Sequence, residues 1–286
     1  MSAPGERPGP SENGNGRYPL LGEPRFSQSL ERGLMILGCF SPERPVLGVA
    51  DIADGLGMRR STTHRYIITL LALGYLEQDS SRKYRLGLGV TDLGMSVLNA
   101  TGLRERAHPH LDELRRETSC TVALAVLNGA DIVYVDRVRS FRPEQREIDL
   151  GLDIGSRLPA HSTAMGKVLL ANLPERELSE LLASVKLAQR GPNTITSKTA
   201  LRVELGQIGE EGFAVNDQEL AAGIHAIAAP VRSVSGEVTA ALGLSAHAAS
   251  ISLGELVDAL GPHLLAAADR ISTRLGYRRE REPAAL

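Results

Sequence analysis

Basic side chains gather in two short stretches near the beginning of the chain. Together these stretches hold six cations, namely Arg59, Arg60, Arg65, Arg82, Lys83 and Arg85. Such side chains bind phosphate oxygens, and an arginine can donate two parallel hydrogen bonds to the edge of a guanine. Clusters of this kind indicate a surface that binds nucleic acid.

The net charge of the whole chain does not reveal these local clusters of basic residues. The formal net charge of −2 argues against a protein coated with cations for general nucleic-acid binding. Between Arg25 and Gly87, however, nine basic residues stand against six acidic ones, a net charge of +3. The predicted basic surface is therefore local, as a DNA footprint would be.

The basic stretches fall on a pattern typical of a winged helix-turn-helix. Apolar spacing predicts helices from Ser27 to about Ser41, over 49–56 and over 59–73, the last two each ending at a glycine. Two strand-like pieces around a polar turn at 79–82 follow. A short helix, a turn with glycine and a longer helix form a helix-turn-helix, and the hairpin after it is a predicted wing.

The third predicted helix has two different faces. At 100° per residue, one face carries Thr63, Ile67, Leu70 and Leu71. The opposite face carries Ser61, His64, Arg65 and Ile68. We expect Arg65, with Ser61 and His64, to read bases in the major groove. Arg59 and Arg60, at the start of the helix, are expected to bind phosphates.

The flank of this helix and the wing supply further candidates. Thr62 and Tyr66 lie on the flank, where Thr62 is a candidate DNA contact, while Thr63 is predicted to pack in the core. On the wing, Arg82, Lys83 and Arg85 are expected to contact phosphates or the minor groove. The alternative for both regions is a solvated basic helix face and a hairpin that is merely soluble.

Length and composition favour a soluble protein of two domains. The chain has 286 residues, of which 42% are hydrophobic and 23% charged. No apolar run reaches the roughly 20 residues needed to cross a bilayer, and the polar start is unlike a signal peptide. We therefore expect a cytoplasmic location. Cys39 and Cys120 lie far apart in apolar stretches, which favours reduced thiols.

Changes in pattern divide the chain into five predicted segments. These are a disordered tail over 1–24, a winged helix-turn-helix over 25–88, a linker helix over 89–102, an effector-binding domain over 103–276 and a tail over 277–286. In the fourth segment, strand-like runs lie at 121–127, 131–138, 146–152, 225–231 and 238–246, with helical stretches near 162–172, 174–185, 198–211 and 252–275. This mixture predicts an α+β fold. A helix after Gly102 is expected to hold Pro109 in its first turn.

The two halves together resemble the IclR family of bacterial regulators. The N-terminal resemblance lies in SLERGLMILGCF, STTHRYIITLLALGYL and the wing end KYRLG. The C-terminal resemblance lies in RLPAHSTAMGKVLLA and in GFAVNDQELAAGIHAIAAPV followed by AALGLS. It covers about residues 26–276 and implies a winged helix-turn-helix joined to a GAF-like α+β effector domain.

The resemblance also implies partners and a pocket. It implies a homodimer or a dimer of dimers on a partly palindromic operator of double-stranded DNA. The N-terminal sequence is similar to that of the branch of the family that controls the catabolism of aromatic acids such as protocatechuate or 4-hydroxybenzoate. The implied pocket positions are Ala164, Met165, Ala226, Gly243 and Ser245. Family members often carry polar residues in place of Ala226 and Gly243, so a bulkier, partly apolar acid is favoured over a small hydrophilic one.

Two further features suggest how an acid is held. Residues 162–166 should turn from loop into helix, where small side chains and the backbone N–H groups of a first turn favour a carboxylate. A capped helix packed tightly on a sheet is the alternative. Among His161, His225 and His247, we expect His225 to hydrogen-bond the acid, because it adjoins the pocket stretch.

No pattern for catalysis, for a cofactor or for a metal stands out. The chain has no G-x-S-x-G elbow, P-loop or G-x-G-x-x-G, and its histidines lack the spacing of metal ligands. We expect a DNA-binding regulator without a metal or cofactor, whose operator binding a small organic acid modulates through the linker helix. The alternative is a small-molecule-binding or enzymatic GAF-like protein that uses its helix-turn-helix for protein interaction.

Overall fold

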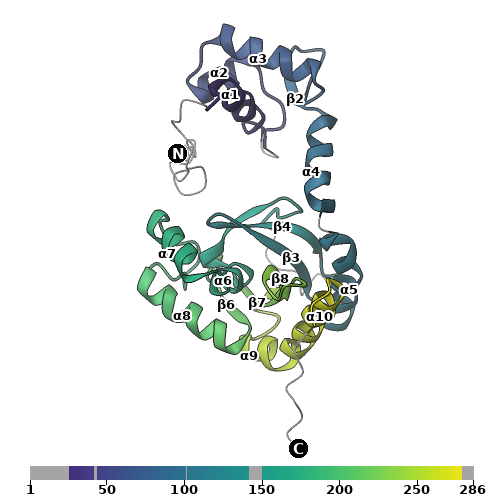
Figure 1. Ribbon diagram of the computed structural model, residues 1–286, viewed down its shortest axis with the longest axis vertical. Helices are drawn as coiled ribbons and strands as arrows, with labels where there is room; N and C mark the ends of the chain where they lie inside the picture. The colour runs from purple at the N-terminus through teal and green to yellow at the C-terminus, as the bar shows by residue number, and fades with distance from the viewer. Residues whose placement is uncertain (1–25, 42–43, 101, 142–149, 279–286) are drawn as a thin grey trace, which may run out of the picture. The chain divides into compact units, whose positions relative to one another are not determined.

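The computed structural model describes residues 26–41, 44–100, 102–141 and 150–278. These residues belong to two compact units that divide between Thr101 and Gly102 (Figure 1). The predicted tail over 1–24, most of the C-terminal tail and most of the predicted strand over 146–152 lie outside the described residues. Residues 150–152, at the described end of that predicted strand, are not in a strand.

The first unit is a winged helix-turn-helix, as predicted. Its elements are α1 (Gln28–Leu37), α2 (Val49–Leu56), α3 (Arg60–Ala72), β1 (Leu76–Gln78), β2 (Tyr84–Leu86) and α4 (Leu88–Ala100). The Ser27 hydroxyl accepts a hydrogen bond from the Leu30 N–H and begins α1. Gly57 ends α2 in the left-handed region, at φ 63°. Ile36, Ile52 and Ile67 form the centre of the core, where each is at most 1% exposed.

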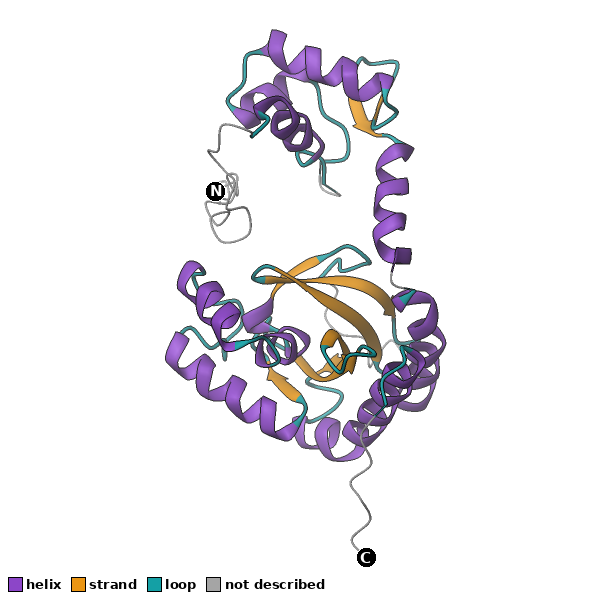
Figure 2. Cartoon of the chain, viewed as in Figure 1, coloured by secondary structure: helices purple, strands orange, loops and turns teal. Residues whose placement is uncertain are grey.

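The second unit is built on one antiparallel sheet. Its strands are β3 (Thr121–Asn128), β4 (Asp131–Val138), β5 (Arg157–Pro159), β6 (Ala214–Asp217), β7 (Ile224–Arg232) and β8 (Val238–His247). They pair in the order β5-β4-β3-β8-β7-β6. Figure 2 shows this sheet in orange with helices packed around it. The strands at the two ends of this order, β5 and β6, are missing from the sequence prediction, because three or four residues are too few to establish a period of two.

Helices cover both faces of this sheet. On one side, α5 (Leu103–Thr118) and α10 (Gly261–Arg274) pack against each other and against the strands. On the other side, α6 (Ala164–Ala171) packs on the sheet and on α8 (Lys198–Glu211), and α7 (Glu175–Ser184) completes that core. The helical stretch predicted near 252–275 is divided into α9 (Leu253–Glu255), a π-helical turn (Leu256–Leu260) and α10.

The prediction for Pro109 is wrong. This proline lies in the interior of α5, six residues after the first helical residue Leu103. The helix begins earlier than the proline indicates because Leu103 and Ala107 are buried, in register with Leu111 and Leu114. Tertiary burial of the whole face therefore outweighs the local preference of proline for a first turn.

The start of α6 packs unusually closely on the preceding turn. Thr163 is the N-cap, and its hydroxyl accepts a hydrogen bond from the Gly166 N–H at 3.1 Å. A Cβ atom at Gly166 would overlap the carbonyl oxygen of Ala160. A side chain at this position would therefore push α6 away from the turn that begins it.

We predict that Gly166→Ala destabilises the protein by about 1–3 kcal/mol, because the added methyl group overpacks a rigid backbone contact. The matched control is Gly206→Ala in α8, where a Cβ atom would meet nothing within 4 Å. This control should be stabilising by roughly 0.5–1 kcal/mol, because alanine favours the helix. Denaturant unfolding measures both, and equal effects of the two substitutions would contradict the assignment.

Candidate functional site

Helix α3 presents the polar face that the sequence predicts. Ser61, His64 and Arg65 are exposed, while Thr63 and Ile67 on the opposite side are both 0% exposed. The burial of Thr63 confirms that it packs in the core, where its hydroxyl donates to the Arg59 carbonyl. Of the other predicted contacts, Arg59 is the N-cap, Arg60 is the exposed first residue of the helix and Thr62 is partly buried.

Tyr66 connects this face to the first helix. Its hydroxyl donates to the Ser29 Oγ at 3.3 Å, which ties α3 to α1. The Arg65 guanidinium carbon lies 5.8 Å from the centre of the Tyr66 ring, within the range of a cation–π contact. Sequence analysis placed Tyr66 on the flank without a role, and the structure makes it a neighbour of Arg65.

The tip of the wing is shaped by one carboxylate. Asp79 Oδ1 accepts hydrogen bonds from the backbone N–H and the hydroxyl of Ser81 and from the Lys83 N–H, at 2.7–3.0 Å. The Ser81 hydroxyl, followed by the N–H of Lys83, holds the pKa of this carboxyl below its ordinary value. The turn keeps Arg82 and Lys83 exposed, with Arg82 in the left-handed region at φ 62°.

Arg85 differs from the other two cations of the wing. It lies directly across the hairpin from Glu77, and its Nη2 is 2.7 Å from Glu77 Oε2. Its charge is therefore already paired in the free protein. The structure separates the predicted wing cations into an exposed pair at the tip and one arginine on the return strand that has a carboxylate partner.

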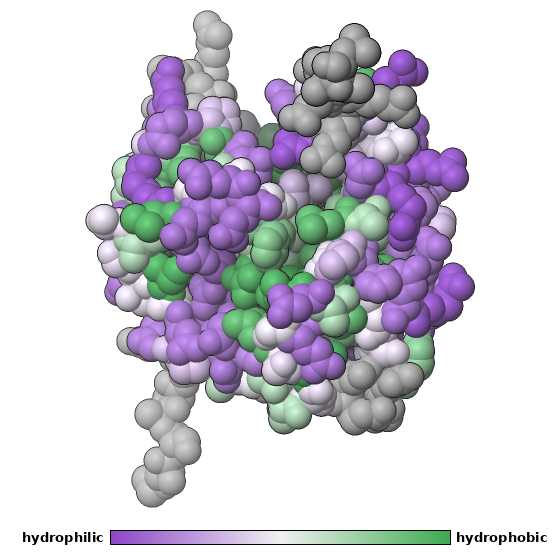
Figure 3. All heavy atoms as spheres, turned by 90° about the horizontal axis from the view of Figure 1, so that it is seen from below, coloured by the Kyte–Doolittle hydropathy of each residue, from purple (hydrophilic) through white to green (hydrophobic). Residues whose placement is uncertain are grey.

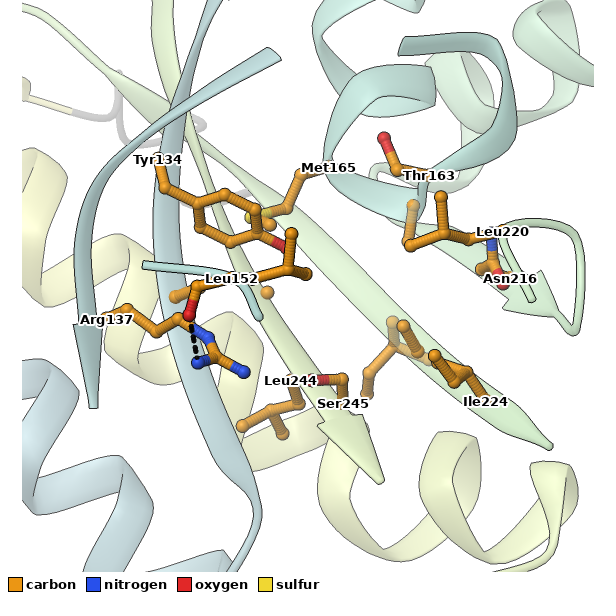
Figure 4. Close-up of a pocket in the computed structure, with 15 residues that line it drawn as sticks. Tyr134, Arg137, Leu152, Thr163, Met165, Asn216, Leu220, Ile224, Leu244 and Ser245 are labelled. Atoms are coloured by element: carbon orange, nitrogen blue, oxygen red, sulfur yellow. Dashed lines mark hydrogen bonds between the residues drawn. The ribbon is translucent and has the colours of Figure 1, made fainter. Parts of the chain in front are cut away.

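The second unit encloses a pocket between its sheet and the start of α6 (Figure 4). Its lining comprises Ala123, Tyr134, Arg137, Leu152, Thr163, Ala164, Met165, Asn216, Leu220, Ile224, Ala226, Ile227, Gly243, Leu244 and Ser245. The space inside this lining is about 480 Å³, part of it open to solvent. Five of the six predicted effector residues are on this lining.

The sixth, His225, is not. Successive residues of a strand point to opposite faces, so the neighbour of Ala226 faces away from the pocket. His225 Nδ1 donates to the Ile251 carbonyl at 3.1 Å, and Nε2 lies 3.1 Å from Oδ1 of Asp217, its cross-strand partner. The prediction that His225 binds an acid in this pocket therefore does not hold.

Strand register explains why small residues form the floor. Ala123 pairs with Arg137 on one side and with Gly243 on the other, so these three residues form one row across neighbouring strands. In a second row, Ser245 pairs with Ala226, which pairs with Asn216. Directly opposed residues share a face of the sheet. Alanine and glycine in these rows leave the space that the pocket occupies.

A β-bulge brings Tyr134 and Arg137 to the same face. Leu124 pairs with Asp136 and Ala125 with Tyr134, so Val135 has no partner on β3. Without this extra residue, positions three apart would point to opposite faces. The sequence analysis therefore missed both side chains, although an arginine inside an apolar strand is a signal that could have drawn attention to one of them.

Polar groups lie at two sides of the pocket (Figure 4). At one side, Arg137 donates from Nη1 to the Leu152 carbonyl at 2.7 Å, and burial raises the pKa of Tyr134 to about 12, so its phenol stays a neutral donor. At the other side are Thr163, the N-cap of α6, and Asn216, whose amide donates to the Ser162 carbonyl at 2.8 Å. The arrangement can hold a molecule with an apolar middle and two polar ends.

Met165 partly fills the room that Gly243 provides. A Cβ atom at Gly243 would lie 2.8 Å from Cγ and 3.0 Å from Sδ of Met165. The absence of a side chain at Gly243 therefore leaves space that Met165 partly occupies, and only the rest is left for a ligand. Because methionine is flexible, a ligand can gain space if this side chain changes rotamer.

The described residues contain no group of three or more His, Cys, Asp and Glu side chains that could hold a metal ion. His161 contacts the Ala188 carbonyl through Nε2 at 3.0 Å, and Nδ1 of His247 accepts from the Ala249 N–H at 3.0 Å. In each of these histidines, one ring nitrogen is thus hydrogen-bonded to a backbone group. Within the same described ranges, no helix combines the length and apolarity needed to span a membrane.

Burial of His161 predicts a pH dependence of stability. Desolvation lowers the pKa of this imidazole below its ordinary value of 6.5. The unfolded chain then binds a proton at pH values where the folded protein does not, so stability from this residue is lost as pH falls through 6.5. We expect His161→Gln to show a smaller loss of stability than the parent protein between pH 7.5 and 5.5 in urea unfolding. Parallel curves for the two proteins would rule out this role.

Comparison with known proteins agrees with both units. Residues 29–80 match the IclR helix-turn-helix domain, and residues 95–273 match the C-terminal domain of bacterial IclR transcriptional regulators. The Pca regulon regulatory protein of Pseudomonas putida is 35% identical over 87% of this chain and 84% of its own length. The p-hydroxybenzoate hydroxylase transcriptional activator of Acinetobacter baylyi is 31% identical over 84% and 88%.

Solved structures give the same result. An IclR homologue from Microbacterium hydrocarbonoxydans, complexed with 4-hydroxybenzoate, is 28% identical, with a TM-score of 0.76 over 86% of this chain and 98% of that one. The Thermotoga maritima IclR is 30% identical, with a TM-score of 0.69 over 87% and 99%. The chain belongs to the IclR family of DNA-binding bacterial transcriptional regulators.

Proposed function

We propose that this regulator binds its operator through α3 and the tip of the wing, and that a hydroxylated aromatic acid in the pocket of the second unit modulates this binding. The observation that carries the effector class is Arg137, a guanidinium group on a lining that is otherwise mostly apolar. A carboxylate at Arg137 would form a charge-assisted hydrogen bond. A ring hydroxyl would then reach the polar side formed by Thr163 and Asn216.

Several relatives support this effector class. The names of two of them refer to the Pca regulon and to p-hydroxybenzoate hydroxylase, and a third was solved with 4-hydroxybenzoate. In this proposal the candidate carboxylate partners are Arg137 and the start of α6, in place of the predicted His225. In the proposal, the guanidinium takes the carboxylate, since a full charge outweighs the partial charge of a helix end.

The proposed role of the pocket is binding without catalysis. None of the described residues on its lining is a histidine, a cysteine or a carboxylate, the side chains that most often serve as bases and nucleophiles. The relatives are named as transcriptional regulators. We therefore infer that the acid is released from the pocket without chemical change. It acts by binding one conformation of the regulator more tightly than another.

Self-association is part of the proposal. In the first unit, Leu30 and Leu34 of α1 are 64% and 59% exposed, and Leu88 and Leu93 of α4 are 76% and 54% exposed. In the second unit, apolar side chains gather on the face seen from below (Figure 3). Phe213, Val257, Pro262 and Leu265 of this unit also line a groove. Exposed apolar surface of this kind supports a homodimer or a dimer of dimers.

We predict that Arg65→Ala weakens binding to the operator by about 1–3 kcal/mol and relaxes its sequence preference, because one base-reading contact is lost. Mobility-shift titration on DNA from upstream of the neighbouring genes measures this. The matched comparison is Lys83→Ala, which should weaken binding to all sequences alike. It should also reduce the slope of log affinity against log salt concentration by roughly one, because one phosphate contact is lost. If Arg65→Ala kept full affinity and preference, α3 would not read bases through this residue.

We predict that 4-hydroxybenzoate raises the melting temperature of the full chain and that its methyl ester does not, because a ligand of the native state stabilises it. Arg137→Met should weaken binding of the acid by about 1.5–3 kcal/mol, the value of a hydrogen bond to a charged group. Arg139→Met is the control, since Arg139 donates to the same Leu152 carbonyl without being on the pocket lining. A response to pyruvate but not to aromatic acids would contradict the proposed effector class.

A further inference from the structure

A lysine is buried in the second unit next to the pocket. Lys167 lies on α6, two residues after Met165, and at 1% exposed it is the largest of the described side chains that are almost fully buried. Its ammonium nitrogen lies 2.6 Å from Glu219 Oε1 and 2.8 Å from Glu204 Oε1. An ammonium group with so little water around it is costly unless it is paired.

Glu219 belongs to the segment that forms one wall of the pocket. This segment, 216–224, carries three lining residues, Asn216, Leu220 and Ile224. The Glu219 N–H donates to the Asn216 side-chain oxygen at 3.2 Å. The Glu219 carbonyl accepts from the Thr194 hydroxyl at 2.6 Å. Glu219 is therefore fixed by its backbone as well as by its carboxylate.

Two attachments join this wall to the start of α6. The first is the hydrogen bond from the Asn216 amide to the Ser162 carbonyl, just before the N-cap. The second is the ion pair from Glu219 to Lys167, four residues after the N-cap Thr163. Since α6 also supplies Ala164 and Met165 to the lining, these attachments hold the 216–224 wall against the start of α6.

The ion pair is poorly suited to a purely stabilising role. Buried pairs of opposite charge often contribute little net stability, because desolvation offsets their attraction. Burial raises the pKa of the Glu219 carboxyl even though Lys167 acts in the opposite direction. Among the described residues, no group donates a hydrogen bond to Glu219 Oε2. What the pair does supply is a fixed geometry between two segments far apart in the sequence.

We propose that Lys167 is a positioning residue for the effector pocket. It holds Glu219, and with it the wall 216–224, in a fixed position against the start of α6, so that the pocket keeps its shape when it is empty. As a statement about effector binding, this inference rests on the proposed function of the pocket. As a statement about the order of the wall, it does not need the identity of the effector.

The test uses the full chain with the double substitution Lys167→Met and Glu219→Gln. Removing both buried charges leaves only Glu204 of the original cluster, and its side chain is 32% exposed to water, so the midpoint of unfolding should stay close to that of the parent protein. Hydrogen exchange of residues 217–224 in the free protein should become about tenfold faster, while α10 stays unchanged. A merely structural pair would instead change exchange throughout the unit, through global stability.

The control is the double substitution Arg176→Met and Glu180→Gln on α7, an exposed ion pair of similar length. It should leave exchange in 217–224 unchanged. If the first variant does not fold, Lys167→Arg takes its place, because it keeps the charge but lengthens the link, and the same local increase in exchange is expected. Unchanged exchange in 217–224 in the folded variant would overturn the proposal.

Calorimetric titration with 4-hydroxybenzoate adds a functional readout. Binding to the Lys167 variant should be about tenfold weaker, the cost of ordering a wall that is no longer fixed in advance. Equal affinity of the variant and the parent would also count against the proposal. If the parent protein does not bind this acid, the proposed effector class fails, while the exchange measurement still decides the role of Lys167.

Discussion

The pocket of the second unit depends on one irregularity in its sheet, the bulge at Val135 in β4. Because Val135 has no partner on β3, the alternation of side chains between the two faces of the sheet is shifted by one residue after the bulge. Tyr134 and Arg137 therefore both point into the pocket. The same bulge turns Asp136 to the other face. A regular strand would have supplied the pocket with only one of its two large polar side chains.

On that other face, Asp136 attaches the sheet to α5. It is 1% exposed, and its carboxylate lies 2.7 Å from His108 Nδ1 and 3.7 Å from Arg104 Nε. Its Oδ1 also accepts the backbone N–H of Arg137, its neighbour on the pocket side. One short stretch of β4 thus contacts both the pocket and the helix that begins one residue after the division between the two units.

The first unit follows simpler rules. Its polar and apolar faces are set by the period of α3, and its core is closed by one isoleucine from each of three helices together with Leu76 and Tyr84 of the wing. Its cations differ in how they are held in the free protein. Arg65 lies beside Tyr66 and Arg85 is paired with Glu77, whereas Lys83 is exposed at the tip of the wing.

Sequence alone determined the features that depend on neighbours along the chain. The faces of α3, the turn at Gly57 and the long strands of the sheet follow from local periods and caps, and the small residues of the pocket floor followed from family resemblance. Tertiary structure decided the rest. The interior position of Pro109, the direction of His225 away from the pocket, the presence of Arg137 in the pocket and the pairing of Lys167 with Glu219 all depend on register, on a bulge or on contacts between segments far apart in sequence. No local pattern encodes such contacts, because the partners meet only once the sheet has formed.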